Sequence, residues 1–141
     1  MKNEPIGKLI SYIHRQNQKE LNKHFTPYGI GSGGQYSFLK AVLATPGVNQ
    51  DQLTQQLNFD KATTARSLKH LESEGYIERK PDPNDRRSLL VYPTSKAEQF
   101  QPTLQRILDD TNKVMLSHLN KEEEDQIISL LQKIRQGLHE E

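Results

Sequence analysis

Residues 49–92 constrain the fold of this chain more than any other segment. Their pattern predicts two short amphipathic helices joined by a tight turn, then two short strands with a basic turn between them. A helix fits the major groove of DNA, and a basic hairpin beside it can enter the neighbouring minor groove. The tract therefore predicts a winged helix-turn-helix that binds double-stranded DNA.

The first of the two helices has a clear start signal. Asn49 is suited to the N-cap, and Gln52 three residues later completes a capping box. Leu53 and Leu57 then form one apolar stripe. Residues 58–60 are predicted to form the turn, and the aspartate that ends it is suited to cap the second helix.

The second helix, residues 61 to about 74, is predicted to be the recognition helix, and Gly75 is suited to end it as a C′ residue. Thr64, Leu68 and Leu71 share one face, which must be buried. The N-terminal half of such a helix reaches the base edges. The residues expected at the floor or lip of the groove are Lys61, Ala62, Thr63 and Arg66. Lys69 and His70 lie further along and are expected to contact phosphate.

Residues 76–80 and 88–92 are predicted to pair as strands, with residues 81–87 as the turn. Arg86 and Arg87 place two fixed charges at or near the tip, where an arginine can enter a narrow A·T-rich minor groove. Asp85 is expected to orient Arg87, since a carboxylate facing phosphate would be repelled, and Ser88 completes the expected contact set. The alternative is that these arginines are ordinary solvated charges.

Two consecutive motifs make the interpretation more specific. Residues 68–79 read LKHLESEGYIER, and residues 82–88 read DPNDRRS. They resemble the pattern L-x-x-L-E-x-x-G-hydrophobic-I-x-R, then D-P-x-D-x-R-S, of the MarR family of bacterial and archaeal regulators. The resemblance covers about residues 30–97. Thr64, Pro93 and Ala97 depart from the Val, Leu and Gly that are usual there, and none of the three is an expected DNA contact.

This resemblance implies a homodimeric transcriptional regulator, with repression by promoter occlusion as the expected mode. It further implies a small effector, often an anionic aromatic, that binds between the dimer helices and the winged helix. Tyr12, Arg15 and Tyr36 are the candidate lining residues, and core packing or surface charge is the alternative for each. Such a ligand acts only through a difference in affinity for two states.

Amphipathic helices are predicted at both ends of the chain, in residues 1–26 and 95–141. Their apolar stripes exceed what a DNA-binding lobe at residues 30–93 can cover. The stripes include Ile6, Leu9, Ile10, Ile13 and Leu21, and Ile127, Leu130, Leu131, Ile134 and Leu138. Packing within one chain is the alternative to pairing between two chains. A two-fold dimer would place its recognition helices about 34–36 Å apart, one turn of DNA.

The expected fold class is mainly α with a small β-hairpin wing, a winged helix-turn-helix with terminal dimerisation helices, in one domain spanning residues 1–141. Net charge is only +1, but it is segregated. Residues 1–24 hold five Lys or Arg against two acidic residues, and residues 93–141 hold six against nine. A basic face can therefore exist on a nearly neutral protein.

Several other classes find no support in the sequence. There are no cysteines, no secretion signal and no long apolar run, so a soluble cytoplasmic protein without disulfides or membrane contact is expected. The five histidines lack metal-ligand spacing, and no enzyme motif or cofactor signature is present. A winged helix used for protein contact and a ligand-independent activator remain as alternatives.

Overall fold

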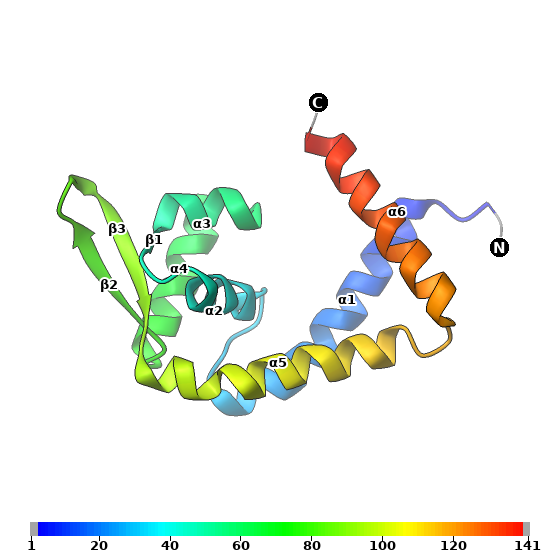
Figure 1. Ribbon diagram of the computed structural model, residues 1–141, viewed down its shortest axis with the longest axis horizontal. Helices are drawn as coiled ribbons and strands as arrows, with labels where there is room; N and C mark the ends of the chain where they lie inside the picture. The colour runs from blue at the N-terminus through cyan, green and yellow to red at the C-terminus, as the bar shows by residue number, and fades with distance from the viewer. Residues whose placement is uncertain (1–2, 140–141) are drawn as a thin grey trace. The chain divides into compact units, whose positions relative to one another are not determined.

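The computed structural model describes residues 3–139, which divide into two compact units, the first ending at Leu108 and the second beginning at Asp109. The first unit contains α1 (Ile6–Phe25), η1 (Thr26–Tyr28), α2 (Gln35–Ala44), β1 (Val48–Asn49), α3 (Gln50–Leu57), α4 (Lys61–Ser73), β2 (Ile77–Asp82), β3 (Asp85–Pro93) and most of α5 (Ser95–Met115). The second contains the end of α5 and α6 (Lys121–His139). The predicted class, mainly α with a small antiparallel sheet, is confirmed (Figure 1).

The sheet has three strands in the order β1-β3-β2, all antiparallel. The predicted hairpin is present, but its strands are longer than expected and only Pro83 and Asn84 lie between them. Pro81 is tolerated within β2 because β2 is an edge strand, where proline is permitted, and Pro83 lies in the turn. Arg86 and Arg87 therefore lie on β3 beside the turn, not in a loop.

The sequence did not predict β1, because a strand of two residues has no detectable period. It forms by pairing across the sheet, with Val48 opposite Val91. The N–H of Gly47 also donates to the Val91 carbonyl at 2.8 Å. This short strand fastens the start of α3 to the base of the wing.

The predicted signals at the ends of α3 and α4 are confirmed. Asn49 Oδ1 accepts the Gln52 N–H at 2.7 Å, and Gln52 Oε1 accepts the Asn49 N–H at 3.0 Å. Asp60 Oδ1 accepts the Thr63 N–H at 2.6 Å at the start of α4. Gly75, with φ +84°, ends α4 in the left-handed conformation that a C′ residue needs.

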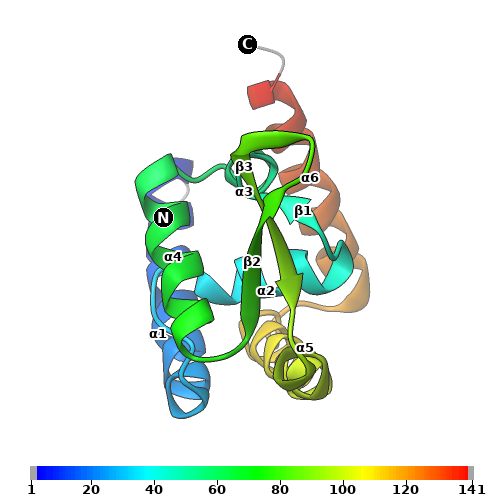
Figure 2. The same ribbon diagram turned by 90° about the vertical axis from the view of Figure 1, so that its left-hand side faces the viewer.

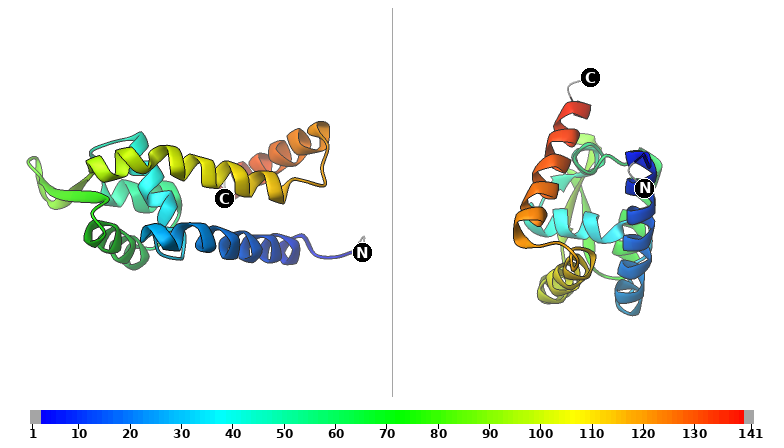
Figure 3. Two further views of the ribbon diagram at one scale, coloured as in Figure 1. Left: turned by 90° about the horizontal axis from the view of Figure 1, so that it is seen from below. Right: turned by 90° about the vertical axis from the view of Figure 1, so that its right-hand side faces the viewer.

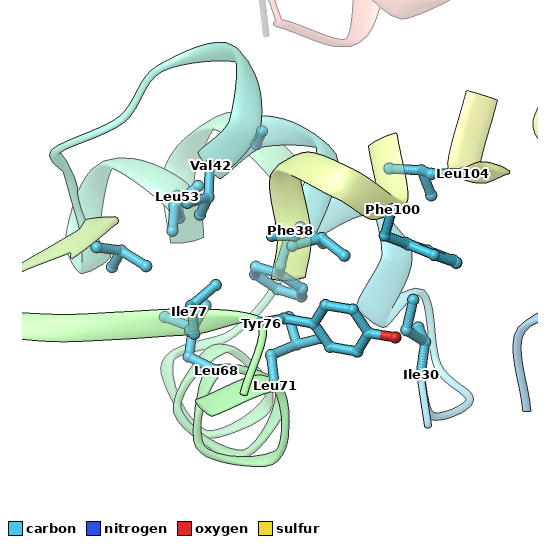
Figure 4. Packing of buried hydrophobic residues seen from close by; sticks show 14 of the residues in the cluster. Ile30, Phe38, Val42, Leu53, Leu68, Leu71, Tyr76, Ile77, Phe100 and Leu104 are labelled. Atoms are coloured by element: carbon cyan, nitrogen blue, oxygen red, sulfur yellow. The ribbon is translucent and has the colours of Figure 1, made fainter. Parts of the chain in front are cut away.

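The core of the first unit is formed around the inward face of α4 (Figure 4). Thr64, Leu68 and Leu71 are each 0 % exposed, as the sequence predicted. Buried side chains of α2, α3, β2 and α5 surround this face, among them Phe38, Val42, Leu53, Ile77, Phe100 and Leu104. The Thr64 hydroxyl also bonds the Thr54 hydroxyl at 2.9 Å, which ties α4 to α3.

The C-terminal end of α1 is fastened to the far end of α4. Leu21 and Phe25 are buried, and η1 follows directly. The Tyr76 hydroxyl donates to the Tyr28 carbonyl, and Nε2 of His70 lies 3.0 Å from the Gly29 carbonyl oxygen. These two bonds connect residues just after α4, and on its last turn, to the segment that follows α1.

In the second unit, α6 begins with a capping box formed by Asn120 and Glu123. None of its described side chains is buried. Across residues 3–139, no helix has both the length and the apolar character needed to cross a bilayer.

The Asp60 cap predicts a pH dependence of stability. The hydrogen bond from the Thr63 N–H, with smaller contributions from the Thr63 hydroxyl and Arg66, lowers the pKa of Asp60 in the folded protein. A lowered folded pKa stabilises the fold above the unfolded pKa, and this contribution is lost as the pH falls through the folded value. Asp60→Asn keeps the cap acceptor but cannot titrate.

We therefore expect the wild-type free energy of unfolding to fall more steeply than that of Asp60→Asn between about pH 5 and about pH 3. Urea denaturation at a series of pH values measures both curves. Parallel curves for the two proteins would show that the Asp60 charge contributes nothing to stability.

Candidate nucleic-acid interface

The outward face of α4 carries most of the predicted major-groove residues. Lys61, Ala62, Arg66 and Lys69 are exposed, and Thr63 is half-buried. Ala62, Arg66 and Lys69 lie opposite the buried face, whereas Lys61 and Thr63 lie nearer its edges on the first turn; the core fixes the rotation of α4 about its axis. Figure 2 shows α4 alongside the hairpin, so that the helix and the wing present adjoining surfaces.

Thr63 has two roles at the start of α4. Its N–H caps the helix through Asp60, and its hydroxyl accepts a bond from Arg66 Nη2 at 3.3 Å. This bond directs the Arg66 guanidinium back toward the N-terminal turn, where the base edges would lie. The guanidinium has five donors, so most remain available for a guanine edge.

The environment of His70 differs from that of its neighbours. The ring is half-buried, and Nε2 bonds the Gly29 carbonyl oxygen. Sequence periodicity placed His70 with the exposed residues, because it could not show that the segment after α1 packs there. Because Nε2 of His70 is engaged by the Gly29 carbonyl oxygen, His70 joins α4 to the segment after α1 and does not offer this nitrogen to phosphate.

The wing projects beyond α4 and ends in a short polar turn (Figure 3). Arg86 and Arg87 are exposed, and Ser88 is half-buried. Asp85 Oδ1 accepts the backbone N–H of Arg87 at 3.0 Å, and Asp82 Oδ1 accepts that of Asn84 at 2.9 Å. Asp85 therefore holds Arg87 through the main chain of Arg87, whereas no bond from Asp85 to the Arg87 guanidinium is seen in the described residues.

Glu72 and Arg79, both within the motif of residues 68–79, form an ion pair at the base of the wing. Arg79 on β2 bonds Glu72 on α4 and Gln50 on α3. The hydrogen bond from Arg79 is the main cause that lowers the pKa of the Glu72 carboxyl. The alternation of side chains along a strand could have predicted this contact. Arg79 lies two residues after Ile77 and therefore on the same inward side of the strand, where an arginine needs a partner.

The three candidate effector residues lie in different surroundings. Tyr36 stacks on Phe25 with ring centroids 5.4 Å apart, and burial raises the pKa of its hydroxyl. Tyr12 and Arg15 are exposed on α1. Nearby on α1, the side-chain oxygens of Asn17 and Gln18 are buried without a hydrogen-bond partner. No group of three or more metal-ligating side chains occurs in the part of the chain that the structure describes.

The chain is similar to known proteins over most of its length. Residues 32–89 match the MarR family model. The HTH-type transcriptional regulator YybA of Bacillus subtilis (strain 168), itself uncharacterised, is 32% identical over 105 residues, which cover 74% of this chain and 70% of that protein.

Solved structures extend the similarity. A MarR transcriptional regulator from Methanosarcina mazei Go1 is 36% identical, with a TM-score of 0.87, over 96% of this chain and 98% of that one. A mutant MarR from Escherichia coli complexed with operator DNA is 26% identical, with a TM-score of 0.83, over 92% and 93%. Members of the family are transcriptional regulators and not enzymes. The motif match and the identity to YybA, with the winged helix described above, show that this chain belongs to the MarR family of DNA-binding transcriptional regulators.

Proposed function

We propose that this chain acts as a homodimeric repressor of a pseudo-palindromic operator and is released by a small effector. The observation that carries the proposal is the set of exposed cations on α4 and the wing, namely Lys61, Arg66, Lys69, Arg86 and Arg87. None of them forms an ion pair within residues 3–139. Cations left unpaired on one lobe are suited to phosphate and base edges.

Each part of the interface has a separate role in this proposal. The major-groove contacts are Lys61, Ala62, Thr63 and Arg66, and Lys69 neutralises phosphate. Arg86 and Arg87 approach a flanking minor groove, Asp85 holds the main chain of Arg87, and Ser88 is a further contact beside them. Occupation of successive major grooves by the two subunits would occlude a promoter.

Dimerisation is supported by apolar side chains left in solvent on the terminal helices. On α1, Ile6, Leu9, Ile10 and Ile13 are between 41 % and 61 % exposed. On α6, Ile127, Leu130, Leu131, Ile134 and Leu138 are between 38 % and 68 % exposed. Apolar stripes of this size are rare on monomers, and a second copy of the chain carries the matching stripes.

The effector proposal extends to α1 and α2. Tyr12, Arg15 and Tyr36 would bind an anionic aromatic compound through a cation and two rings. The unpartnered oxygens of Asn17 and Gln18 offer further hydrogen bonds there to ligand or water.

The recognition helix is tested by two single substitutions. Arg66→Ala should cost about 1–3 kcal/mol on the cognate site and relax base preference at one position per half-site. Lys69→Ala should weaken all sequences about equally and reduce the salt slope by about one. Binding to single-base operator variants at two salt concentrations separates these outcomes. Uniform weakening by Arg66→Ala would contradict base reading by Arg66.

Dimerisation is tested on α6. Leu131→Asp should shift the protein from dimer toward monomer at micromolar concentration, because an unpaired charge in an apolar interface is costly. Gln136→Asp adds the same charge on the opposite face of α6 and should leave the dimer intact. Sedimentation equilibrium measures both. A wild-type mass near the 16.2 kDa of one chain throughout this range would contradict the dimer.

Effector control is tested with benzoate, the simplest anionic aromatic probe. We expect benzoate to release the protein from its operator, and Arg15→Ala to reduce that response while leaving binding without benzoate unchanged. Acetate at equal concentration is the control, because added salt alone weakens DNA binding. Equal release by the two anions would contradict an aromatic effector.

A further inference from the structure

Arg79 joins three elements of the DNA-binding lobe through one guanidinium group. Nη2 donates to Glu72 Oε1 at 3.0 Å and Nε donates to Glu72 Oε2 at 3.4 Å, a two-pronged pair between β2 and α4. Nη1 donates to Gln50 Oε1 on α3 at 3.4 Å. The wing is thereby bonded to both helices of the helix-turn-helix at one point.

This point lies where the apolar support of the wing ends. Ile77 is 2 % exposed, and Val91, the partner of Arg79 across the sheet, is 0 % exposed. Beyond Arg79 toward the tip, in the described residues, no hydrogen bond or ion pair joins the wing to a helix. The Arg79 side chain is thus the outermost side-chain tie between the wing and the helices, one residue short of the main-chain pairing of Asn49 with Leu90.

Because the tip lies far from this tie, a small change in the angle between the wing and the helices displaces the tip by a large distance. Arg87 lies four residues from Val91 along β3, or about 13 Å at roughly 3.3 Å per residue. A turn of about 10° at Arg79 would move Arg87 by about 2 Å, which is large beside a minor groove about 6 Å wide. A small change at the base is therefore enough to misplace the tip.

We infer that Arg79 is a positioning residue, and that Glu72 and Gln50 hold it so that the wing enters the minor groove while α4 occupies the major groove. The inference rests on the proposed minor-groove role of the wing. The pair is partly exposed, with the Arg79 side chain 19 % and the Glu72 side chain 39 % exposed, so solvent screens it and its contribution to stability is modest. The pair therefore acts on orientation more than on folding.

The experiment uses the DNA duplex that the wild-type protein selects from a random pool, prepared with A·T-rich or G·C-rich flanks. The flank preference is the ratio of the two affinities. We expect Arg79→Met to reduce this preference at least about fivefold, comparable to the loss of one groove contact, while affinity for the G·C-flanked duplex changes less than about twofold. Lys80→Met is the matched control, because it removes one cation from the outer side of the same strand.

Arg87→Ala separates the inference from the proposed function. If Arg87→Ala loses the flank preference and Arg79→Met keeps it, the positioning role is wrong and the minor-groove role stands. If the wild type shows no preference, or Arg87→Ala retains it, both are overturned. If Lys80→Met loses the flank preference as Arg79→Met does, the loss of a positive charge explains both results, and the positioning role is overturned.

Thermal denaturation would reveal whether Arg79→Met unfolds. Two milder variants keep the inference testable in that case. Arg79→Lys keeps the charge but cannot bond Glu72 at two points and Gln50 as well. Glu72→Gln removes only the partner charge. Each should lower the flank preference, and their effects should be less than additive in the double variant, because both break one bond network. Full additivity, or an unchanged preference in both, would contradict the inference.

Discussion

Burial of one face of α4 is the constraint on which the other features depend. Leu68 and Leu71 are fully buried, and a helix advances 100° per residue, so the direction of every other side chain on α4 is fixed. Turning the helix by one residue would bring Lys69 toward the core, where an unpaired charge is far more costly than any gain in packing. The same leucines that stabilise the lobe therefore direct Arg66 and Lys69 outward.

The wing depends on α4 in a different way. Its base is held by apolar contact at Ile77 and Val91, but its tip must stay charged and exposed to meet DNA. Apolar side chains at the tip would instead lie beside the charged phosphates of DNA. The bonds of Arg79 to Glu72 and Gln50 give the hairpin a defined angle without apolar surface. Orientation beyond the core thus comes from hydrogen-bond geometry.

Local signals were enough to predict the caps of α3 and α4, the left-handed glycine after α4 and the buried face of that helix, since each depends on residues within one or two turns. The contacts that sequence could not predict join distant segments. His70 meets Gly29 across 41 residues, and Arg79 meets Gln50 across 29. Strand β1 and the true length of the hairpin likewise depend on pairing partners. In the wing, two prolines also made the sequence look like a loop where the strands continue.

The bonds of His70 and Tyr76 also bear on how a signal could reach DNA. Both attach the segment after α1 to the far end of α4, whereas the wing is attached near the middle of the lobe by Arg79. These bonds attach the segment after α1 to α4, which is itself packed in the core through Thr64, Leu68 and Leu71. The wing follows α4 as long as Arg79 keeps Glu72. A displacement of α1 that preserves these bonds would therefore shift α4 and the wing together, while the angle between α4 and the wing is set locally by the bonds of Arg79.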